Sequence, residues 1–243
     1  MTMPSIPDLT LTQMLRAHAR ERPDALALRQ KDFGIWQAYS WQDYYRRARH
    51  FGLGLRAMGL EPGGHVAIIS ENRVEWVIGQ MGIGLVQGIC VGVYPTSPWN
   101  EVAYVLEHSD AEFVICEDQE QTDKVLEAWP DLPKLKHCIA IDMKGLRYYP
   151  EPPSAFEDIE ARGREFETQH PNLVDELLDS QQMDDTALMI YTSGSTGRPK
   201  GAMISWHNLH AAAPGLIELL QADEHGSSLS YLPLCHVAEQ AFT

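Results

Sequence analysis

The sequence has few cysteines and few basic residues, and each shortage argues against a class of protein. Its four cysteines lie far apart and form no C-x-x-C pair, as a zinc site or redox motif would need. Three of them stand in apolar, strand-like runs and are expected to be inert core residues. This cysteine usage favours a cytoplasmic, reducing compartment. The net charge of −15 argues against nucleic-acid binding, which needs a basic surface.

The chain also lacks the segments that carry a protein into a membrane. Residues 1–10 contain neither a basic region nor an apolar run, so they do not form a signal peptide. The longest apolar stretch, 74–93, includes Glu75, Gln80 and Gln87 and is interrupted by glycines. A membrane span needs about twenty predominantly apolar residues, so we expect a helix followed by a strand here. A peripheral contact with a membrane surface stays open.

The pattern along the rest of the chain is typical of an α/β protein. Its 243 residues, 44% of them hydrophobic, suffice to bury a sizeable core. Apolar runs alternate with helical patterns, which predicts βαβ units and a largely parallel sheet with flanking helices. The expected strands are 65–70, 89–93, 111–116, 137–141, 187–190, 202–204 and 229–232. The expected helices are 9–20, 73–86, 101–108, 119–129, 173–178 and 208–220.

Two further expectations concern the ends of elements. Residues 25–30 and 35–39 alternate as a hairpin, after which Ser40 begins a helix that closes at Gly59. Residues 143–172 hold four prolines among many acidic side chains and have weak periodicity. We expect this stretch to be a surface excursion with only a short helix near its middle.

The segment Y-T-S-G-S-T-G-R-P-K-G, residues 191–201, lies between two strand-like runs. Gly194 and Gly197 permit positive φ and a close approach of the backbone to a ligand. Free N–H groups in such a turn form a concave anion site. Lys200 adds a positive charge, which suits a polyphosphate. The hydroxyl donors are Thr192, Ser193, Ser195 and Thr196.

Other phosphate-binding motifs do not fit this segment. A Walker loop has the form G-x-x-x-x-G-K-[ST] and opens into a helix, whereas here Pro199 precedes the lysine and Gly201 follows it. The dinucleotide fingerprint G-x-G-x-x-G is also absent. From composition alone, a polar hairpin tip stays open as the alternative, because Ser, Thr and Gly are common in turns.

The ordered string 191–201 resembles the phosphate-binding signature of the adenylate-forming enzymes, which include acyl-CoA synthetases, peptide-synthetase adenylation domains and luciferases. The resemblance implies ATP binding and activation of a carboxylate as an acyl-adenylate. It places Thr192 near Mg²⁺ and the phosphates, and Lys200 at the end of the loop. The residues implied to surround the β- and γ-phosphates are Ser193, Gly194, Ser195, Thr196 and Gly197.

A histidine, His236, follows the expected strand 229–232, and ligands bind beyond the carboxyl ends of strands in parallel sheets. A surface or helix-capping histidine stays open as the alternative. Residues 232–236 resemble the L-P-L-x-H motif of long-chain acyl-CoA synthetases, where this histidine lies beside the acyl-adenylate. A Cys235–His236 nucleophile pair is disfavoured, because neighbouring side chains at a strand end point to opposite sides.

Residues 70–76 and 93–98 resemble the same synthetases, so the likeness runs from residue 25 to residue 243. Two positions depart from the family pattern. Trp206 follows Ser205 where the family usually has histidine, and His207 cannot be assumed to replace it. Gln240 stands where the family often has arginine after Glu239, which leaves the role of that arginine in doubt.

The resemblance leads to one expectation for the whole chain. Residues 1–243 form the N-terminal part of the AMP-binding (adenylation) domain of a long-chain fatty acid–CoA ligase, without its C-terminal domain. Its ligands are ATP, Mg²⁺, CoA and a fatty acid, its catalytic residues are Thr192, Lys200 and His236, and Thr192 contacts the metal. The 243 residues alone are expected to be inactive.

Two other functions stay open. One is an adenylating ligase for an aromatic or amino acid, and the other is a noncatalytic nucleotide-binding fragment. The sequence specifies neither the acyl chain length nor the oligomeric state.

Overall fold

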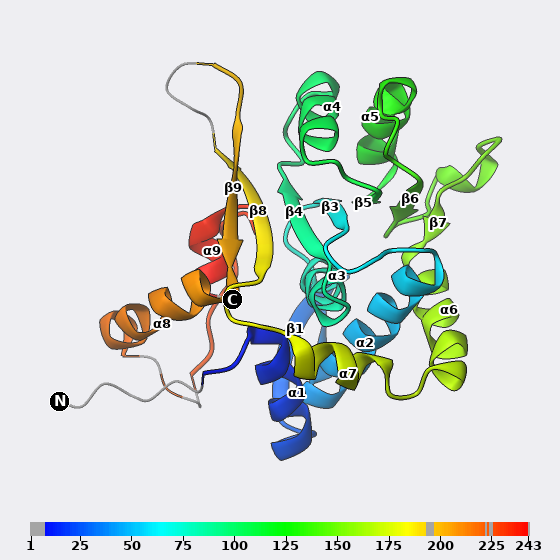
Figure 1. The fold of residues 1–243 in the computed structure, drawn as a ribbon. Coiled ribbons are helices and arrows are strands. Elements are labelled where there is room, and N and C mark those ends of the chain that lie inside the picture. The colour runs from blue at the N-terminus through cyan, green and yellow to red at the C-terminus, as the bar shows by residue number, and fades with distance from the viewer. Residues whose placement is uncertain (1–7, 193–196, 222, 224–225, 243) are drawn as a thin grey trace.

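The computed structural model describes residues 8–192, 197–221, 223 and 226–242. In these ranges the central element is a seven-stranded sheet with the strand order β7-β6-β5-β3-β4-β8-β9 (Figure 1). All neighbouring pairs are parallel except β8 and β9, so the expected largely parallel α/β fold is confirmed. The strands are β3 (His65–Ile69), β4 (Ile89–Val93), β5 (Phe113–Cys116), β6 (His137–Ala140), β7 (Ser154–Ala155), β8 (Thr186–Thr192) and β9 (Lys200–Ser205).

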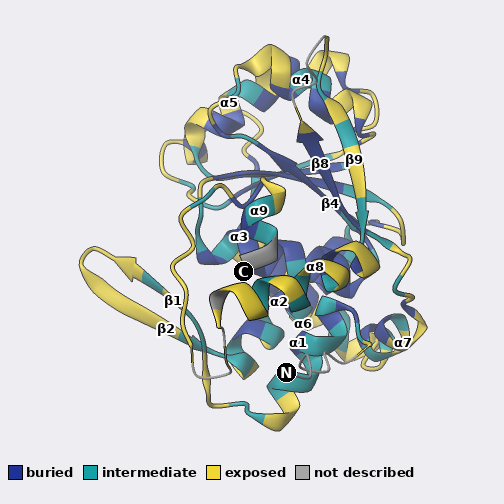
Figure 2. Cartoon of the chain, turned by 90° about the vertical axis from the view of Figure 1, so that its left-hand side faces the viewer, coloured by how far each residue is buried: buried dark blue, intermediate teal, exposed yellow. Residues whose placement is uncertain are grey.

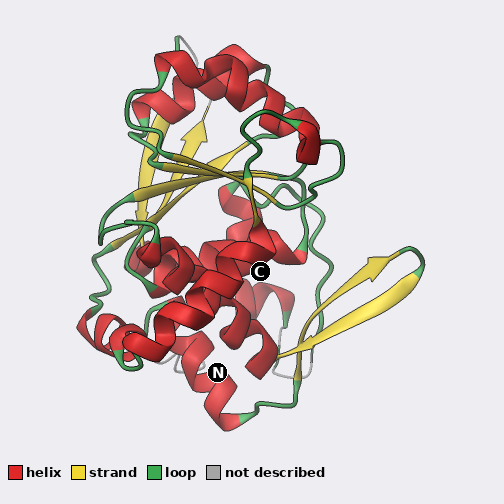
Figure 3. Cartoon of the chain, turned by 90° about the vertical axis from the view of Figure 1, so that its right-hand side faces the viewer, coloured by secondary structure: helices red, strands yellow, loops and turns green. Residues whose placement is uncertain are grey.

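Helices cover both faces of the sheet, as Figure 3 shows. Successive side chains of a strand point to opposite faces, so Ile68 belongs to one buried core and Ile69 to the other. Helices α4 (Trp99–His108) and α5 (Gln119–Ala128) pack on the Ile69 side, and five other helices pack on the Ile68 side. Those helices are α1 (Leu11–Glu21), α2 (Trp41–Ala57), α3 (Val74–Leu85), α6 (Phe156–Gln169) and α7 (Leu173–Ser180). Short 3₁₀ helices span Trp129–Asp131 and Leu146–Tyr148.

The apolar stretch 74–93 consists of α3 and β4, as expected. In the part of the chain that the structure describes, no helix is both long enough and apolar enough to cross a membrane.

The hairpin of β1 (Leu26–Asp32) and β2 (Ile35–Ser40) stands away from this body (Figure 2). Ser40 then begins α2, because its hydroxyl accepts a hydrogen bond from Asp43 N at 3.1 Å while the Asp43 carboxylate accepts one from Ser40 N. The helix is followed by Gly59, which has φ +97°. The expected hairpin and both ends of this helix are confirmed.

Residues 143–172 differ from the expected surface excursion. They contribute strand β7 to the sheet and the fourteen-residue helix α6, whose Phe156 is buried and stacks on Phe51 with 4.0 Å between ring centroids. The expectation was wrong because the prolines flank this helix and do not interrupt it.

Helices α2 and α6 approach closely because glycines line their contact. A Cβ atom added to Gly163 would lie 1.7 Å from the His50 carbonyl oxygen, and one added to Gly54 would lie 2.1 Å from the Ile159 carbonyl oxygen. At the edge of the contact, Arg47 forms an ion pair of 2.8 Å with Glu160 of α6, which is buried. The backbones therefore pack at a distance that any larger residue would prevent.

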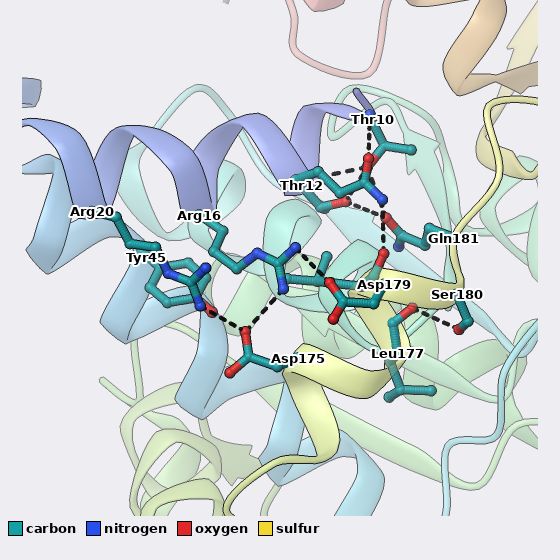
Figure 4. Close-up of polar contacts among 12 residues, drawn as sticks. Thr10, Thr12, Arg16, Arg20, Tyr45, Asp175, Leu177, Asp179, Ser180 and Gln181 are labelled. Atoms are coloured by element: carbon teal, nitrogen blue, oxygen red, sulfur yellow. Dashed lines mark hydrogen bonds and ion pairs between the residues drawn. The ribbon is translucent and has the colours of Figure 1, made fainter. Parts of the chain in front are cut away.

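Helix α1 is joined to α3 and α7 by a buried amide (Figure 4). Gln181 Oε1 accepts hydrogen bonds from the hydroxyls of Thr10 at 2.8 Å and Thr12 at 2.6 Å, and its Nε2 donates to Gly84 O at 2.7 Å. On the outside, Arg16 donates to Asp175 and Asp179 of α7. The buried network orients α1 because each of its polar groups has a partner.

The last part of the chain corrects another expectation. Helix α8 (Trp206–Leu220) is present, but 229–232 forms no strand, and β9 runs antiparallel to β8 instead of completing a βαβ unit. A strand needs a neighbouring strand for its backbone groups, and no described strand lies beside 229–232. Side chains satisfy these groups instead, and helix α9 (Val237–Phe242) follows.

We expect Gly163→Ala to lower the free energy of unfolding by about 2–3 kcal/mol or more, because the added methyl group forces α2 and α6 apart. Gly215→Ala in α8 is the matched control, since a Cβ atom there meets nothing within 4 Å. The control should change stability by no more than about 1 kcal/mol, in the stabilising direction. Urea unfolding followed by tryptophan fluorescence measures both. Equal stability of the two variants would contradict the close helix contact.

Candidate functional site

The carboxyl ends of β3, β4 and β8 lie at one edge of the sheet. In the parallel ladders Ile69 pairs with Val93, and Gly92 pairs with Ile190, so the three strands end side by side. Ligands of open parallel sheets bind beyond such an edge. The candidate site therefore consists of the segments that follow these strands, among them 70–73, together with 192–200 at the end of β8.

The predicted phosphate segment is the tip of the β8–β9 hairpin. Thr192 ends β8, Lys200 begins β9, and the two residues are paired in the antiparallel ladder with both side chains exposed. The predicted residues Ser193, Gly194, Ser195 and Thr196 lie outside the described residues. Gly197 has φ +120°, a conformation that residues with a Cβ atom rarely adopt.

Helix α4 supports the two strand ends that flank this tip. Tyr104 donates a hydrogen bond from its hydroxyl to Pro199 O at 2.9 Å, and the Arg198 guanidinium lies 5.2 Å from the Tyr104 ring centroid. His108, one turn further along, shares a 2.8 Å hydrogen bond with the Tyr191 hydroxyl. Burial raises the pKa of Tyr191 to about 12, so this hydroxyl stays protonated. Sequence reasoning missed Tyr104, whose only signal is its helical spacing from His108.

A hollow of about 670 Å³ lies between α4 and residues 198–199. Three acidic side chains, Glu101, Glu107 and Asp131, take part in its lining together with Arg198. A polyphosphate would meet more negative than positive charge there, so this hollow does not extend the phosphate site.

The predicted His236 also reaches the carboxyl edge of the sheet, on a turn that precedes α9. A Cβ atom added to Gly92 would lie 2.9 Å from Cys235 Cα, so the turn packs directly on β4. The His236 ring is exposed, and its Nδ1 accepts a hydrogen bond from Ala238 N at 3.1 Å. The histidine therefore caps the start of α9 while its Nε2 remains the ring nitrogen available to a ligand.

Cys235 is unsuited to nucleophilic chemistry. Its side chain is buried, and this burial raises the pKa of the thiol to about 12. At neutral pH the group is almost wholly in the unreactive thiol form. The buried thiol and the exposed His236 do not form a nucleophile pair.

The two departures from the family pattern have structural roles. Trp206 is buried against Gly84, and its backbone N–H bonds to Asp185 O at the amino end of β8, which is the end of the sheet opposite the candidate site. Gln240 accepts a hydrogen bond from Gln80 Nε2 at 2.6 Å and donates one to Leu234 O. His207 is exposed next to Trp206 at the start of α8, so it also lies at the end of the sheet opposite the candidate site.

The described ranges contain no group of three or more His, Cys, Asp or Glu side chains that could hold a metal ion. The Thr192 hydroxyl is a single oxygen donor at the end of β8. A Mg²⁺ ion here would need further ligands, which water, one or two carboxylates and the phosphates of a bound substrate commonly supply.

Comparison with known proteins finds a matching family model and similar enzymes. The family model described as "AMP-binding: AMP-binding enzyme" matches residues 15–243. The long-chain-fatty-acid–CoA ligase ACSBG2 of Xenopus laevis is 31% identical over 97% of this chain, which corresponds to 32% of that protein.

Two solved structures share the fold. A protein described as a long-chain-fatty-acid CoA ligase from Rhodopseudomonas palustris is 26% identical, with a TM-score of 0.77 over 98% of this chain and 55% of that chain. The o-succinylbenzoate CoA synthetase of Bacillus subtilis, solved with its acyl-adenylate intermediate, is 22% identical, with a TM-score of 0.67 over 94% of this chain and 51% of that chain. The chain spans about a third of the length of the curated relatives it matches.

We expect Cys235 to resist alkylation in the folded protein. A pKa of about 12, in place of the ordinary value near 9, lowers the thiolate fraction roughly a thousandfold at neutral pH, and burial further blocks access. Iodoacetamide labelling at pH 7.5, read by peptide mass spectrometry, should modify Cys235 only after unfolding in urea. Rapid labelling of the folded chain would restore the Cys235–His236 pair as a candidate.

Proposed function

This chain belongs to the AMP-binding enzyme family, and we propose that it is part of a ligase that activates a long-chain fatty acid with ATP and transfers the acyl group to CoA. The observation that carries the proposal is the position of the β8–β9 hairpin tip and His236 on one sheet edge. The similarity to long-chain-fatty-acid–CoA ligases at about 30% identity supports the choice of acid.

The proposed reaction has two steps. A carboxylate oxygen of the fatty acid attacks the α-phosphorus of ATP, which forms acyl-AMP and releases pyrophosphate. The CoA thiolate then attacks the acyl carbon, which forms the thioester and releases AMP. Neither step needs a nucleophile from the protein, which agrees with the buried thiol of Cys235. The protein's task is to orient two anions and to stabilise the charge that develops on pyrophosphate.

Each part of the hairpin tip has a proposed role in the first step. The Thr192 hydroxyl contacts the phosphates and Mg²⁺, whose charge helps to neutralise the triphosphate. Backbone amides and hydroxyls of residues 193–197 surround the β- and γ-phosphates. Lys200, exposed and opposite Thr192, assists by its positive charge and not by proton transfer.

His236 is proposed to contact the acyl-adenylate. Because Nδ1 accepts a hydrogen bond from Ala238 N, the neutral ring carries its proton on Nε2. That nitrogen can donate a hydrogen bond to the carbonyl or phosphate oxygen at the reacting centre. Its exposed position at the end of β4 supports this role.

An adenylating ligase for an aromatic or amino acid is the second candidate, because the phosphate segment alone does not select the acid. A noncatalytic nucleotide-binding fragment is the third. We place the enzyme in the cytoplasm because its cysteines are unpaired. Contact with a membrane surface would suit a long-chain fatty acid as substrate, which partitions into membranes.

Acid-dependent ATP–pyrophosphate exchange across a panel of carboxylic acids tests this proposal. In a protein that carries these residues at the length of the matched relatives, we expect long-chain fatty acids to give the fastest exchange. The 243-residue chain alone should bind Mg·ATP with a Kd of about 1 mM, or about 4 kcal/mol, and form no thioester. Faster exchange with an aromatic or amino acid would favour the second candidate, and no exchange with any acid would favour the third.

Gly197→Val is expected to abolish exchange while the fold persists, because a β-branched residue opposes φ +120° at the proposed phosphate contact. Gly34→Val is the matched control, since Gly34 has φ +85° at the β1–β2 tip and also has open space around it. Both variants carry similar backbone strain, but only the first should lose exchange by about 100-fold or more. Equal activity of the two variants would rule out the phosphate role of this hairpin tip.

A further inference from the structure

The turn that carries His236 is held to the end of β3 by one side chain, Asn72. Its Nδ2 donates hydrogen bonds to Ser230 Oγ at 2.9 Å and to Leu232 O at 2.6 Å. Its Oδ1 accepts a hydrogen bond from Leu234 N at 2.9 Å. One amide thus binds three groups that lie about 160 positions further along the chain.

The geometry of this contact imitates a β-ladder. In a ladder, the N–H and C=O of one residue bracket a residue of the neighbouring strand, and a side-chain amide offers the same donor and acceptor. Asn72 brackets Pro233 in this way, between Leu232 O and Leu234 N. It therefore replaces the strand partner that residues 229–232 lack.

Two further side chains complete the set of partners. Glu239 Oε2 accepts a hydrogen bond from Leu232 N at 3.1 Å, and Gln240 Nε2 donates one to Leu234 O. Gln240 is in turn bound by Gln80, which is buried in α3. The N–H and C=O groups of both leucines are thus satisfied, and we call Asn72, Glu239, Gln240 and Gln80 the turn clamp.

The base of the clamp is itself fixed. The backbone N–H of Glu71 donates to Glu117 Oε2 at 2.7 Å, and Arg73 forms ion pairs with Glu75 at 2.8 Å and Glu117 at 3.5 Å. Glu117 follows β5, the neighbour of β3. Asn72 therefore stands on a rigid support from which it can set the position of the turn.

We propose that Asn72 is a positioning residue, which fixes residues 230–236 on the carboxyl edge of the sheet and so holds the His236 ring at the acyl-adenylate. The inference rests on the proposed function and adds a residue to its site. Asn72 does not contact the β8–β9 hairpin through any of these bonds, so its role concerns the acid and not the triphosphate.

The test uses the protein at the length of the matched relatives. The rate of ATP–pyrophosphate exchange is measured while the fatty acid and ATP concentrations are varied in turn. We expect Asn72→Ala to lower kcat/KM for the fatty acid about 100-fold, by freeing the turn, and to leave KM for ATP within about twofold. Asn172→Ala is the matched control, because Asn172 is exposed at the start of α7 and its side chain makes no capping bond. The proposal would be overturned if kcat/KM fell equally for the fatty acid and for ATP, or if it fell for neither.

Asn72→Asp adds a readout that a merely structural residue would not move. An ionised carboxylate opposes the Leu232 carbonyl, whereas the protonated acid regains an O–H donor for it. Activity relative to the wild type should therefore rise as pH falls from about 8 to about 5. The nearby charged groups, Glu71, Arg73, Glu117 and Glu239, are present in both proteins, so a pH effect confined to the variant reports the new carboxyl group. A ratio that does not change with pH contradicts the clamp, even if Asn72→Ala fails to fold.

Hydrogen exchange on the 243-residue chain separates failure of the clamp from failure of the proposed function. The Leu234 amide should exchange at least tenfold faster in Asn72→Ala than in the wild type, whatever reaction the protein catalyses. Unchanged exchange at Leu234 would overturn the clamp. Faster exchange at Leu234 in a protein without acid-dependent activity would retain the clamp and reject the function.

Discussion

The shared carboxyl edge of β3, β4 and β8 is the constraint on which the site depends. Because these strands are parallel and in register, Asn72 after β3 and Thr192 at the end of β8 come to one edge although they are far apart in the sequence. Gly92 then lets the Cys235–His236 turn lie directly on β4. A shift of one residue in either ladder would turn every strand side chain to the other face and separate these groups.

The helices behind the sheet make this edge rigid. Glycines bring α2 against α6, as at Gly54 and Gly163, so that the buried layer leaves little room for the strands to move. On the same face of the sheet, Gln181 fixes α1 on α3. On the opposite face of the sheet, Tyr104 of α4 holds the β8–β9 hairpin at Pro199, next to its tip. Thr192, Gly197 and Lys200, which flank the tip, are thus exposed on an anchored support, which is a common arrangement for binding segments.

The sequence predicted what local patterns encode. Apolar runs and capping residues such as Ser40 marked the helices and the parallel strands, and the string 191–201 indicated the hairpin tip with its glycine at positive φ. Prediction from the sequence failed where a partner far along the chain decides the local structure. Helix α6 depends on a glycine contact with α2, and residues 229–232 depend on a side chain at position 72. No periodicity encodes such contacts, so the Asn72 contact became visible only in the folded chain.

The central claim is that the nucleotide binds at the carboxyl edge, and hydrogen–deuterium exchange of the 243-residue chain with millimolar Mg·ATP tests it most directly. The account predicts slower exchange in peptides that cover 191–201. It predicts no change at the amino end of the strands, where Gly84, Gln181 and Trp206 line a hollow of about 210 Å³. Protection around that hollow, with none in 191–201, would contradict the account.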